Sequence, residues 1–279
     1  MLTSSPGAEA LQKDPYPHYA TPDALEDYAS LCRDFPAEDT FAGSIRMHGD
    51  LTSGDEGYAD LLARSQAYRA LHQWVYSTSF VATFLDLFDD DIDERVRAGD
   101  LLYDPRDLKI SPDPVEGRDL LGVNNLYDTE PFLFPRMDIG IGRLDYGKVN
   151  GGRGIHVDNL TRLVSILVYI DDNDTMVGGE HRLYRLEDFR PVISKVYKPE
   201  GNLMVASLQT NEALHDVNPI TAIEGVRKAI YMAVSCSAEI WRPSTDKRIQ
   251  RLGKSRYKAS LGERAMRKIW RKLGGAGQG

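Results

Sequence analysis

The chain has 279 residues, of which 42% are hydrophobic and 27% are charged, and its formal net charge is −8. This composition is that of an ordinary globular protein, and it excludes collagen-like and low-complexity chains. No run of eighteen apolar residues occurs, so we expect no transmembrane helix, and residues 1–19 lack the apolar centre of a secretory signal. Cys32 and Cys236 lie far apart in the sequence, and we expect free thiols in a reducing, cytoplasmic protein.

The chain is long enough for two domains, but we expect one with additions, because no linker rich in Pro, Gly and Ser divides it. The expected fold class is mostly β with helical additions, α+β. The expected regions are a disordered or irregular N-terminus at 1–20, a helical support region and loop at 21–117, a β core at 118–241, and a basic tail with a short helix at 242–279.

Two stretches ahead of the β core have helical spacing, 24–35 and 58–88. In the second, apolar residues recur every three or four positions, which predicts amphipathic helices packed on the core. Ser65 is a small polar interruption on this apolar face, and Ser77 or Ser79 is suited to cap a second helix running through Leu87. The acidic run that follows, 86–94, is interpreted as a solvated helix end and not as a metal site.

The basic tail contrasts with the rest of the chain. Residues 242–279 hold twelve Lys and Arg against two Asp and Glu, a net charge of +10, so residues 1–241 carry −18. A helix with one apolar face is expected at about 261–273. We favour a tail that docks on the acidic part or stays solvated, and weak peripheral membrane contact is left open. No nucleic-acid-binding motif is present, so no nucleic acid partner is expected.

The pattern His-x-Asp occurs twice. His48-Gly49-Asp50 is followed by a polar loop and then a helical pattern, with no strand to hold two ligands, so we interpret it as a surface turn. His156-Val157-Asp158 instead follows a glycine-rich stretch and precedes the apolar, β-branched run 163–170, which predicts a buried strand. In extended backbone, residues i and i+2 point to the same side, so His156 and Asp158 can reach one metal ion together.

Further strands are predicted at 180–184, 203–208 and 226–236. His215 lies on a turn-like segment between the last two, and Arg227 lies at the start of the final strand. Short strands separated by turns favour a β-barrel-like core. Two imidazoles and one carboxylate are the ligand set that holds one face of a non-haem Fe(II) ion and leaves the other face open.

Several sequence pieces in this order resemble Fe(II)/2-oxoglutarate-dependent dioxygenases of the prolyl 4-hydroxylase type. The resemblance implies a double-stranded β-helix, or jelly roll, with a cupin-like core buttressed by the N-terminal helices. It implies Fe(II), 2-oxoglutarate and O2 as cofactor and co-substrates, with ascorbate a candidate reductant. The pieces are Arg143-Leu144-Asp145-Tyr146-Gly147, His156-Val157-Asp158-Asn159, Arg162 to Tyr169, Gly178-Gly179-Glu180, and His215 to Arg227.

Carried over to this sequence, the resemblance makes His156, Asp158 and His215 the iron ligands. It makes Arg227 the partner of the distal carboxylate of 2-oxoglutarate, with Tyr146 and Tyr169 as further contacts. A planar guanidinium can bind a carboxylate through two parallel hydrogen bonds, which supports that role. The spacing from His215 to Arg227 is slightly longer than in similar enzymes, so Lys228 is an alternative partner.

The expected activity is hydroxylation of an unactivated C–H bond in a polar small molecule, with release of succinate and CO2. Polar and cationic residues near the metal in sequence favour an amino-acid derivative, a sugar or a nucleotide conjugate, and His181 is interpreted as exposed or facing the substrate. Three alternatives stay open. They are a peptidyl, prolyl-type hydroxylase, a cupin-like metal protein that does not use 2-oxoglutarate, and a non-catalytic binding module.

Overall fold

The computed structural model describes residues 1–4, 6–7, 10–41, 48–112, 130–144, 154–188, 190–247 and 249. Tyr146 and the helix expected at 261–273 lie outside these ranges. The helices are α1 (Tyr28–Asp34), α2 (Glu56–Arg64), α3 (Gln66–Val75), α4 (Thr78–Leu87) and α5 (Asp89–Ala98), with short 3-10 turns η2 (Glu38–Phe41) and η3 (Pro105–Asp107).

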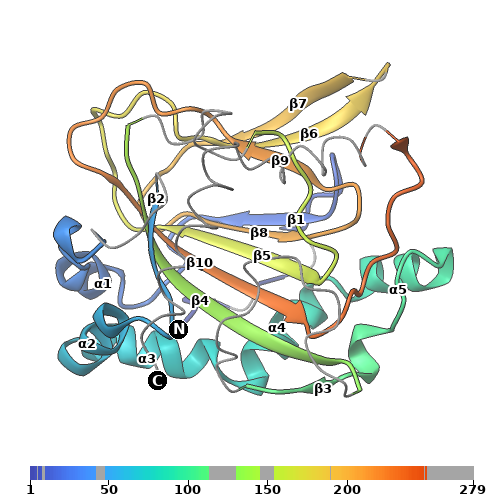
Figure 1. Cartoon of the computed structure of the whole chain (residues 1–279), viewed down its shortest axis with the longest axis horizontal. Coiled ribbons are helices and arrows are strands. Elements are labelled where there is room, and N and C mark those ends of the chain that lie inside the picture. The colour runs from blue at the N-terminus through green and yellow to red at the C-terminus, as the bar shows by residue number, and fades with distance from the viewer. Residues whose placement is uncertain are drawn as a thin grey trace, which may run out of the picture.

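Two antiparallel sheets face each other, as Figure 1 shows. The larger has the strand order β1-β8-β5-β10-β4-β2, and the short β3 pairs in parallel with β4. Its strands are β1 (His18–Thr21), β2 (His48–Leu51), β3 (Lys109–Ile110), β4 (Phe132–Gly142), β5 (Arg162–Tyr169), β8 (Met204–Leu208) and β10 (Arg227–Cys236). The smaller sheet has the order β7-β6-β9, with strands β6 (His181–Glu187), β7 (Arg190–Tyr197) and β9 (Leu214–Val217).

The connectivity between the sheets is that of a double-stranded β-helix. The chain passes from β4 in the large sheet to a single bridge at His156, which pairs with His215 beside β9, and returns to the large sheet as β5. It then forms β6 and β7 in the small sheet, β8 in the large, β9 in the small, and β10 in the large. This alternation makes a jelly roll, and the expected fold class is confirmed.

The two faces of the large sheet have different chemistry. Along β10, Ile230, Met232 and Val234 belong to the hydrophobic core that includes the helices, and α3 and α4 contact β4 on this outer face. In Figure 1 these helices lie beneath the large sheet, and the small sheet lies above it. The alternate residues of β10 face the small sheet, since successive side chains in a strand point to opposite sides. The space between the sheets therefore receives the polar side chains of Arg227 and Tyr231.

Two serine residues cap the N-termini of helices in the helical region. Ser65 accepts a hydrogen bond from the backbone N–H of Tyr68 and begins α3, so it ends one helix and starts another instead of interrupting a single one. Ser77 caps α4 in the same way, as predicted. The acidic run 86–94 supplies the first turn of α5, where negative charge is favourable because the helix dipole is positive there.

Several segments differ from the sequence-based expectation. His48-Gly49-Asp50 is not a surface turn: it forms β2, which pairs with β4. The segment around His215 is strand β9 and not a turn, because it pairs with β6. The N-terminal region, expected to be disordered or irregular over 1–20, forms β1 from His18, the edge strand of the large sheet.

The N-terminal segment also reaches the small sheet. Its Asp14 carboxylate accepts a 2.7 Å hydrogen bond from the Ser194 hydroxyl on β7, while His18 begins β1 on the large sheet. Lys13 pairs with Asp91, a buried residue of α5. Residues 13–21 thus connect one edge of the large sheet to one edge of the small sheet and to the helical layer.

Gly178 allows a close approach between two loops that flank the small sheet. Its φ is +93°, and a Cβ at this position would lie 2.0 Å from the carbonyl oxygen of Pro219. We expect Gly178→Ala to lower the free energy of unfolding by about 2–4 kcal/mol, since it adds backbone strain and overpacking. Gly99→Ala is the matched control, because Gly99 has φ +75° but a Cβ added there would meet no atom within 4 Å. Equal losses for the two variants in urea denaturation would contradict the steric explanation.

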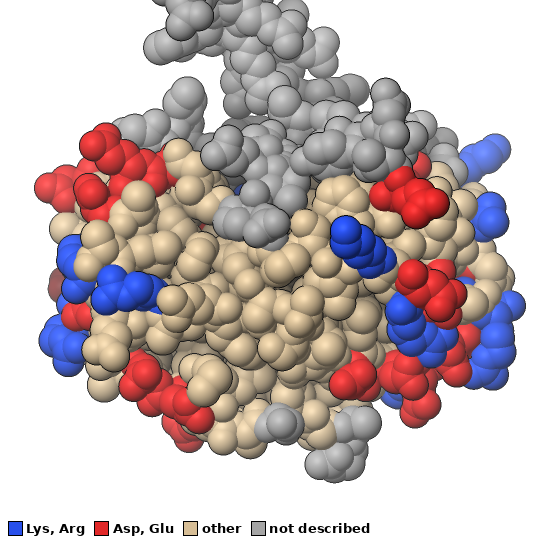
Figure 2. Space-filling view, turned by 90° about the horizontal axis from the view of Figure 1, so that it is seen from below, with Lys and Arg blue, Asp and Glu red and all other residues tan. Residues whose placement is uncertain are grey.

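The surface charge is mixed on the face seen in Figure 2. Uncharged side chains cover most of its centre, and most acidic and basic side chains lie toward its left and right sides. Within the described ranges, no helix is both long and apolar enough to cross a membrane.

Candidate metal centre

The backbone brings His156 and His215 side by side. Each donates its N–H to the carbonyl oxygen of the other, at 3.0 and 2.9 Å, which makes an antiparallel hydrogen-bonded pair. Directly opposed residues in such a pair project their side chains to the same side. The two imidazole centroids are accordingly 4.3 Å apart. A single bridge is therefore enough to place two candidate ligands from distant parts of the chain together.

Both imidazoles are oriented by backbone carbonyl groups. The Nδ1 atom of His156 lies 2.6 Å from the carbonyl oxygen of Gly154, and that of His215 lies 3.0 Å from the carbonyl oxygen of Ala213. A carbonyl oxygen can only accept, so in each ring Nδ1 carries a proton, and in the neutral imidazole Nε2 keeps its lone pair. This tautomer is the one that allows Nε2 to bind a metal ion.

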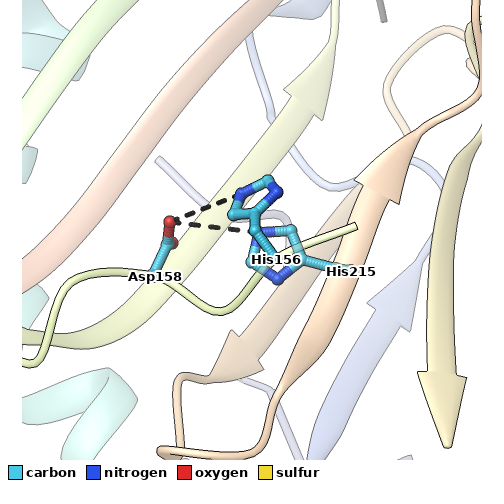
Figure 3. A group of neighbouring side chains, drawn as sticks. All are labelled: His156, Asp158 and His215. Atoms are coloured by element: carbon cyan, nitrogen blue, oxygen red, sulfur yellow. Dashed lines mark ion pairs between the residues drawn. The ribbon is translucent and has the colours of Figure 1, made fainter. Parts of the chain in front are cut away.

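Asp158 completes the cluster from the loop that leads into β5. Its Oδ1 atom lies 3.9 Å from Nε2 of His156 and 4.0 Å from Nε2 of His215. Figure 3 shows the carboxylate turned toward both rings. One ligand atom from each of the three residues lies within 4.8 Å of the others, so one ion could contact all three.

The donor set fits Fe(II). Two neutral imidazoles and one carboxylate on one side of an ion match the facial triad of non-haem iron, in which the remaining positions stay open. His156 is buried and Asp158 and His215 are largely buried, so bulk water has little access to the three donor atoms. The three residues that the sequence predicts as ligands are brought together by the fold.

Arg227 and Tyr169 lie beside each other between the sheets. Ala229 is paired with Tyr169, and Arg227 shares the inner face of β10 with Ala229. The guanidinium carbon of Arg227 is 4.9 Å from the centre of the Tyr169 ring, and both side chains are buried. Lys228, in contrast, projects to the other face, where its Nζ pairs with Asp171 at 2.8 Å. This arrangement favours Arg227 over Lys228 as the carboxylate partner.

His181 lies on the metal-facing side of the small sheet. Leu183 is paired with His215, and His181, two residues earlier in β6, shares that side. Its ring centroid is 5.6 Å from that of His215. Burial, followed by the proximity of His215 and Arg227, lowers the pKa of His181 to about 3. The side chain is therefore a neutral hydrogen-bonding group beside His215 and within electrostatic reach of Arg227.

Several residues near the cluster were not identified from the sequence as site residues. Ser165 donates a 2.9 Å hydrogen bond to Asp158 Oδ2, and its hydroxyl lies 3.0 Å from that of Tyr231. Tyr16, from the N-terminal segment, packs against Leu183 and Ala213. Burial and then the negative charge of Asp158 raise the pKa of Tyr16. Strand register and the path of the N-terminus determine these positions, and no local sequence signal reports either.

The chain was compared with known proteins. A scan against protein-family models and a search of curated proteins found no match. A prolyl 4-hydroxylase from Pseudomonas putida is similar in structure, with 16% identity and a TM-score of 0.41, over 82% of this chain and 97% of that one. A Trichoplax adhaerens prolyl hydroxylase, solved with a hypoxia inducible factor peptide fragment, has 11% identity and a TM-score of 0.35, over 82% and 88%.

A Burkholderia pseudomallei oxidoreductase of the 2OG-Fe(II) oxygenase family has 16% identity and a TM-score of 0.29, over 43% of this chain and 52% of that one. The chain likewise spans only 46% of a Bacillus thuringiensis structure and 58% of a Phytophthora capsici prolyl 4-hydroxylase. The solved structures to which the chain is similar thus include prolyl 4-hydroxylases and a member of the 2-oxoglutarate–Fe(II) oxygenase family.

Proposed function

We propose that the protein is an Fe(II)- and 2-oxoglutarate-dependent dioxygenase that hydroxylates a C–H bond of a polar small molecule. The observation that carries this proposal is the convergence of His156, Asp158 and His215 with both imidazoles fixed in the metal-binding tautomer. Two histidines with a purely structural role in the sheet would not require a carboxylate oxygen at nearly the same distance from both Nε2 atoms, as Asp158 Oδ1 is here.

Arg227 supports the choice of 2-oxoglutarate as co-substrate. This residue places a permanent positive charge between the sheets, next to the Tyr169 ring and close enough to His181 to lower its pKa. A dicarboxylate that contacted the metal at one end would leave its other carboxylate for a bidentate pair with the guanidinium. His181, which stays neutral, can add a hydrogen bond without adding charge.

A polar substrate is supported by the inner face of β4. Asp138 is paired with Tyr231 and Arg136 with Ala233, so both charged side chains face the space between the sheets. They form an ion pair with 2.5 Å between Nη2 and Oδ2, and both are mostly buried. An apolar substrate packed against this ion pair would remove its remaining contact with water, a desolvation that is unfavourable even for paired charges. A substrate with hydroxyl, amino or carboxylate groups would meet suitable partners.

The protein residues have distinct roles in the proposed reaction. Fe(II) with 2-oxoglutarate and O2 supplies the oxidising power, and the balanced products are succinate, CO2 and the hydroxylated substrate. Arg227 would bind and orient the dicarboxylate, and His156, Asp158 and His215 would hold the ion. The enclosed position of the cluster between the two sheets limits the access of water.

An anaerobic titration tests the proposal. Fe(II) is added to the purified protein, followed by 2-oxoglutarate, and we expect a weak visible charge-transfer band that is missing in Asp158→Ala. If metal binds but no band forms, the alternative of a cupin-like metal protein that does not use 2-oxoglutarate would be favoured. If no metal binds, the metal site itself would be refuted. If the band forms, succinate release is then measured with amino-acid derivatives, sugars and nucleotide conjugates, and with a proline-containing peptide. If only the peptide increased succinate release, the proposed substrate would be peptidyl and not a small molecule.

A further inference from the structure

A chain of hydrogen bonds runs from Asp158 away from the two histidines. Oδ2 of Asp158 accepts from the hydroxyl of Ser165 at 2.9 Å, and the Ser165 hydroxyl lies 3.0 Å from that of Tyr231. The Tyr231 hydroxyl accepts in turn from Nη1 of Arg162. We call these three residues, Ser165, Tyr231 and Arg162, the Asp158 relay. The other oxygen, Oδ1, is the one that faces the imidazoles.

The direction of each bond in the relay follows from counting protons. Ser165 has one hydroxyl proton, and a carboxylate oxygen can only accept it. The bond between Ser165 and Tyr231 must therefore use the phenolic proton, which burial retains because it raises the pKa of Tyr231. The guanidinium of Arg162 donates to the phenol. All three donors thus point toward Asp158, and bonds in such a chain polarise and strengthen one another.

The strand register places the side chains of the relay next to one another. Ser165 is paired with Ala233, and Tyr231 lies two residues before Ala233 on the same face of β10, so the two hydroxyls are diagonal neighbours. The register then shifts between Val234 and Ser235, so that Arg162 and not Leu163 is paired with Ser235. A bulge of this kind re-aims a side chain. Here it turns Arg162 to the inner face and leaves Leu163 in the hydrophobic core.

We propose that the Asp158 relay is a positioning device that makes Asp158 bind the metal through one oxygen only. This inference rests on the proposed function, because it assumes a metal at the cluster. With Oδ2 engaged by Ser165, the carboxylate presents Oδ1 to the imidazoles, and a rotation that offered both oxygens would break the hydrogen bond from Ser165. A carboxylate that bound through both would take a position that the co-substrate needs. Ser165, Tyr231 and Arg162 are thus positioning residues that act through Asp158.

The test measures Co(II) affinity of the metal-free protein by calorimetry, with no dependence on turnover. We expect Tyr231→Phe and Ser165→Ala to weaken binding roughly 10- to 100-fold, the usual effect of removing a partner that orients a metal ligand. Ser165→Thr keeps a hydroxyl and should bind within about threefold of the wild type.

Two control variants separate positioning from stability. Ser235→Ala removes a buried hydroxyl from the same inner face of β10, one that has no hydrogen-bond partner among the described residues. Tyr68→Phe removes a buried tyrosine hydroxyl that donates to the Leu31 carbonyl in the helical layer. Both should retain wild-type Co(II) affinity, whatever their unfolding midpoints in urea.

Each result decides between the inference and the proposed function. Wild-type affinity in both Tyr231→Phe and Ser165→Ala would overturn the relay and leave the oxygenase proposal intact. Weakened binding in Ser165→Ala that Ser165→Thr fails to restore would also overturn it. Metal binding that depends on the relay, without any 2-oxoglutarate band in the wild type, would support the relay and refute the co-substrate. A wild-type protein that binds no Co(II) would refute both.

Discussion

Replacing His156 or His215 by alanine is expected to abolish turnover and to remove most of the affinity for Fe(II). Each imidazole supplies one of three protein donors, and a backbone carbonyl orients its Nε2 atom by accepting a hydrogen bond from Nδ1. The loss of metal affinity should exceed the roughly 10- to 100-fold effect of losing an outer hydrogen-bond partner. Metal content after anaerobic loading and gel filtration, together with succinate release, measures both effects.

His72→Gln is the control for the histidine variants. His72 is partly buried in the helical layer, where its Nδ1 lies 2.9 Å from the Tyr58 hydroxyl, and it contacts none of the three candidate ligands. It should load the same amount of Fe(II) as the wild type, even if its stability falls. Full metal content and turnover in His215→Ala would remove that residue from the ligand set.

Arg227→Ala is expected to raise the apparent KM for 2-oxoglutarate far more than it weakens metal binding. Loss of one charged partner of an enclosed carboxylate changes the binding free energy by about 2–5 kcal/mol, roughly 30-fold or more in affinity. The measurement is succinate release as a function of 2-oxoglutarate concentration, alongside Fe(II) affinity. The KM of Arg227→Lys for 2-oxoglutarate should fall between that of the wild type and that of Arg227→Ala, because lysine keeps the charge and loses the bidentate geometry.

Lys228→Ala is the matched control for Arg227→Ala. The neighbouring cation lies on the opposite face of β10, paired with Asp171 and 5.7 Å from the Phe35 ring centre. Its removal should leave the KM unchanged. A raised KM in Lys228→Ala together with an unchanged KM in Arg227→Ala would transfer the carboxylate-binding role to the lysine.

The sequence predicts best those strands that are buried on both faces. β5, β8 and β10 appear as continuous apolar runs, and their observed limits lie within one residue of the predicted ones. β4 was not predicted, because its inner face carries Arg136 and Asp138 and its run contains Pro135. The proline is tolerated because β3 and β2 pair with β4 on either side of it, at 132–133 and 139–142.

The site residues also differ in whether a local sequence pattern or long-range strand pairing identifies them. His156 and Asp158 form a local pattern, and His215 and Arg227 follow in a recognisable order, so sequence reasoning could name them. Ser165 and Tyr231 become neighbours only through the pairing of β5 with β10 and carry no motif of their own. The short edge strand β9 was missed because four residues give too little periodicity to distinguish a strand from a turn.

The order of synthesis has a consequence for how the barrel is completed. Among the described residues β10 is the last strand to emerge from the ribosome, yet it lies between β4 and β5 and pairs with both. Until then these two strands lack their shared neighbour and expose edges that invite wrong pairing. A polypeptide cut short before β10 would still contain all three residues of the triad. It would lack Arg227, Tyr231 and the strand that joins β4 to β5, so the candidate site and the continuous large sheet can be completed only after β10 has been made.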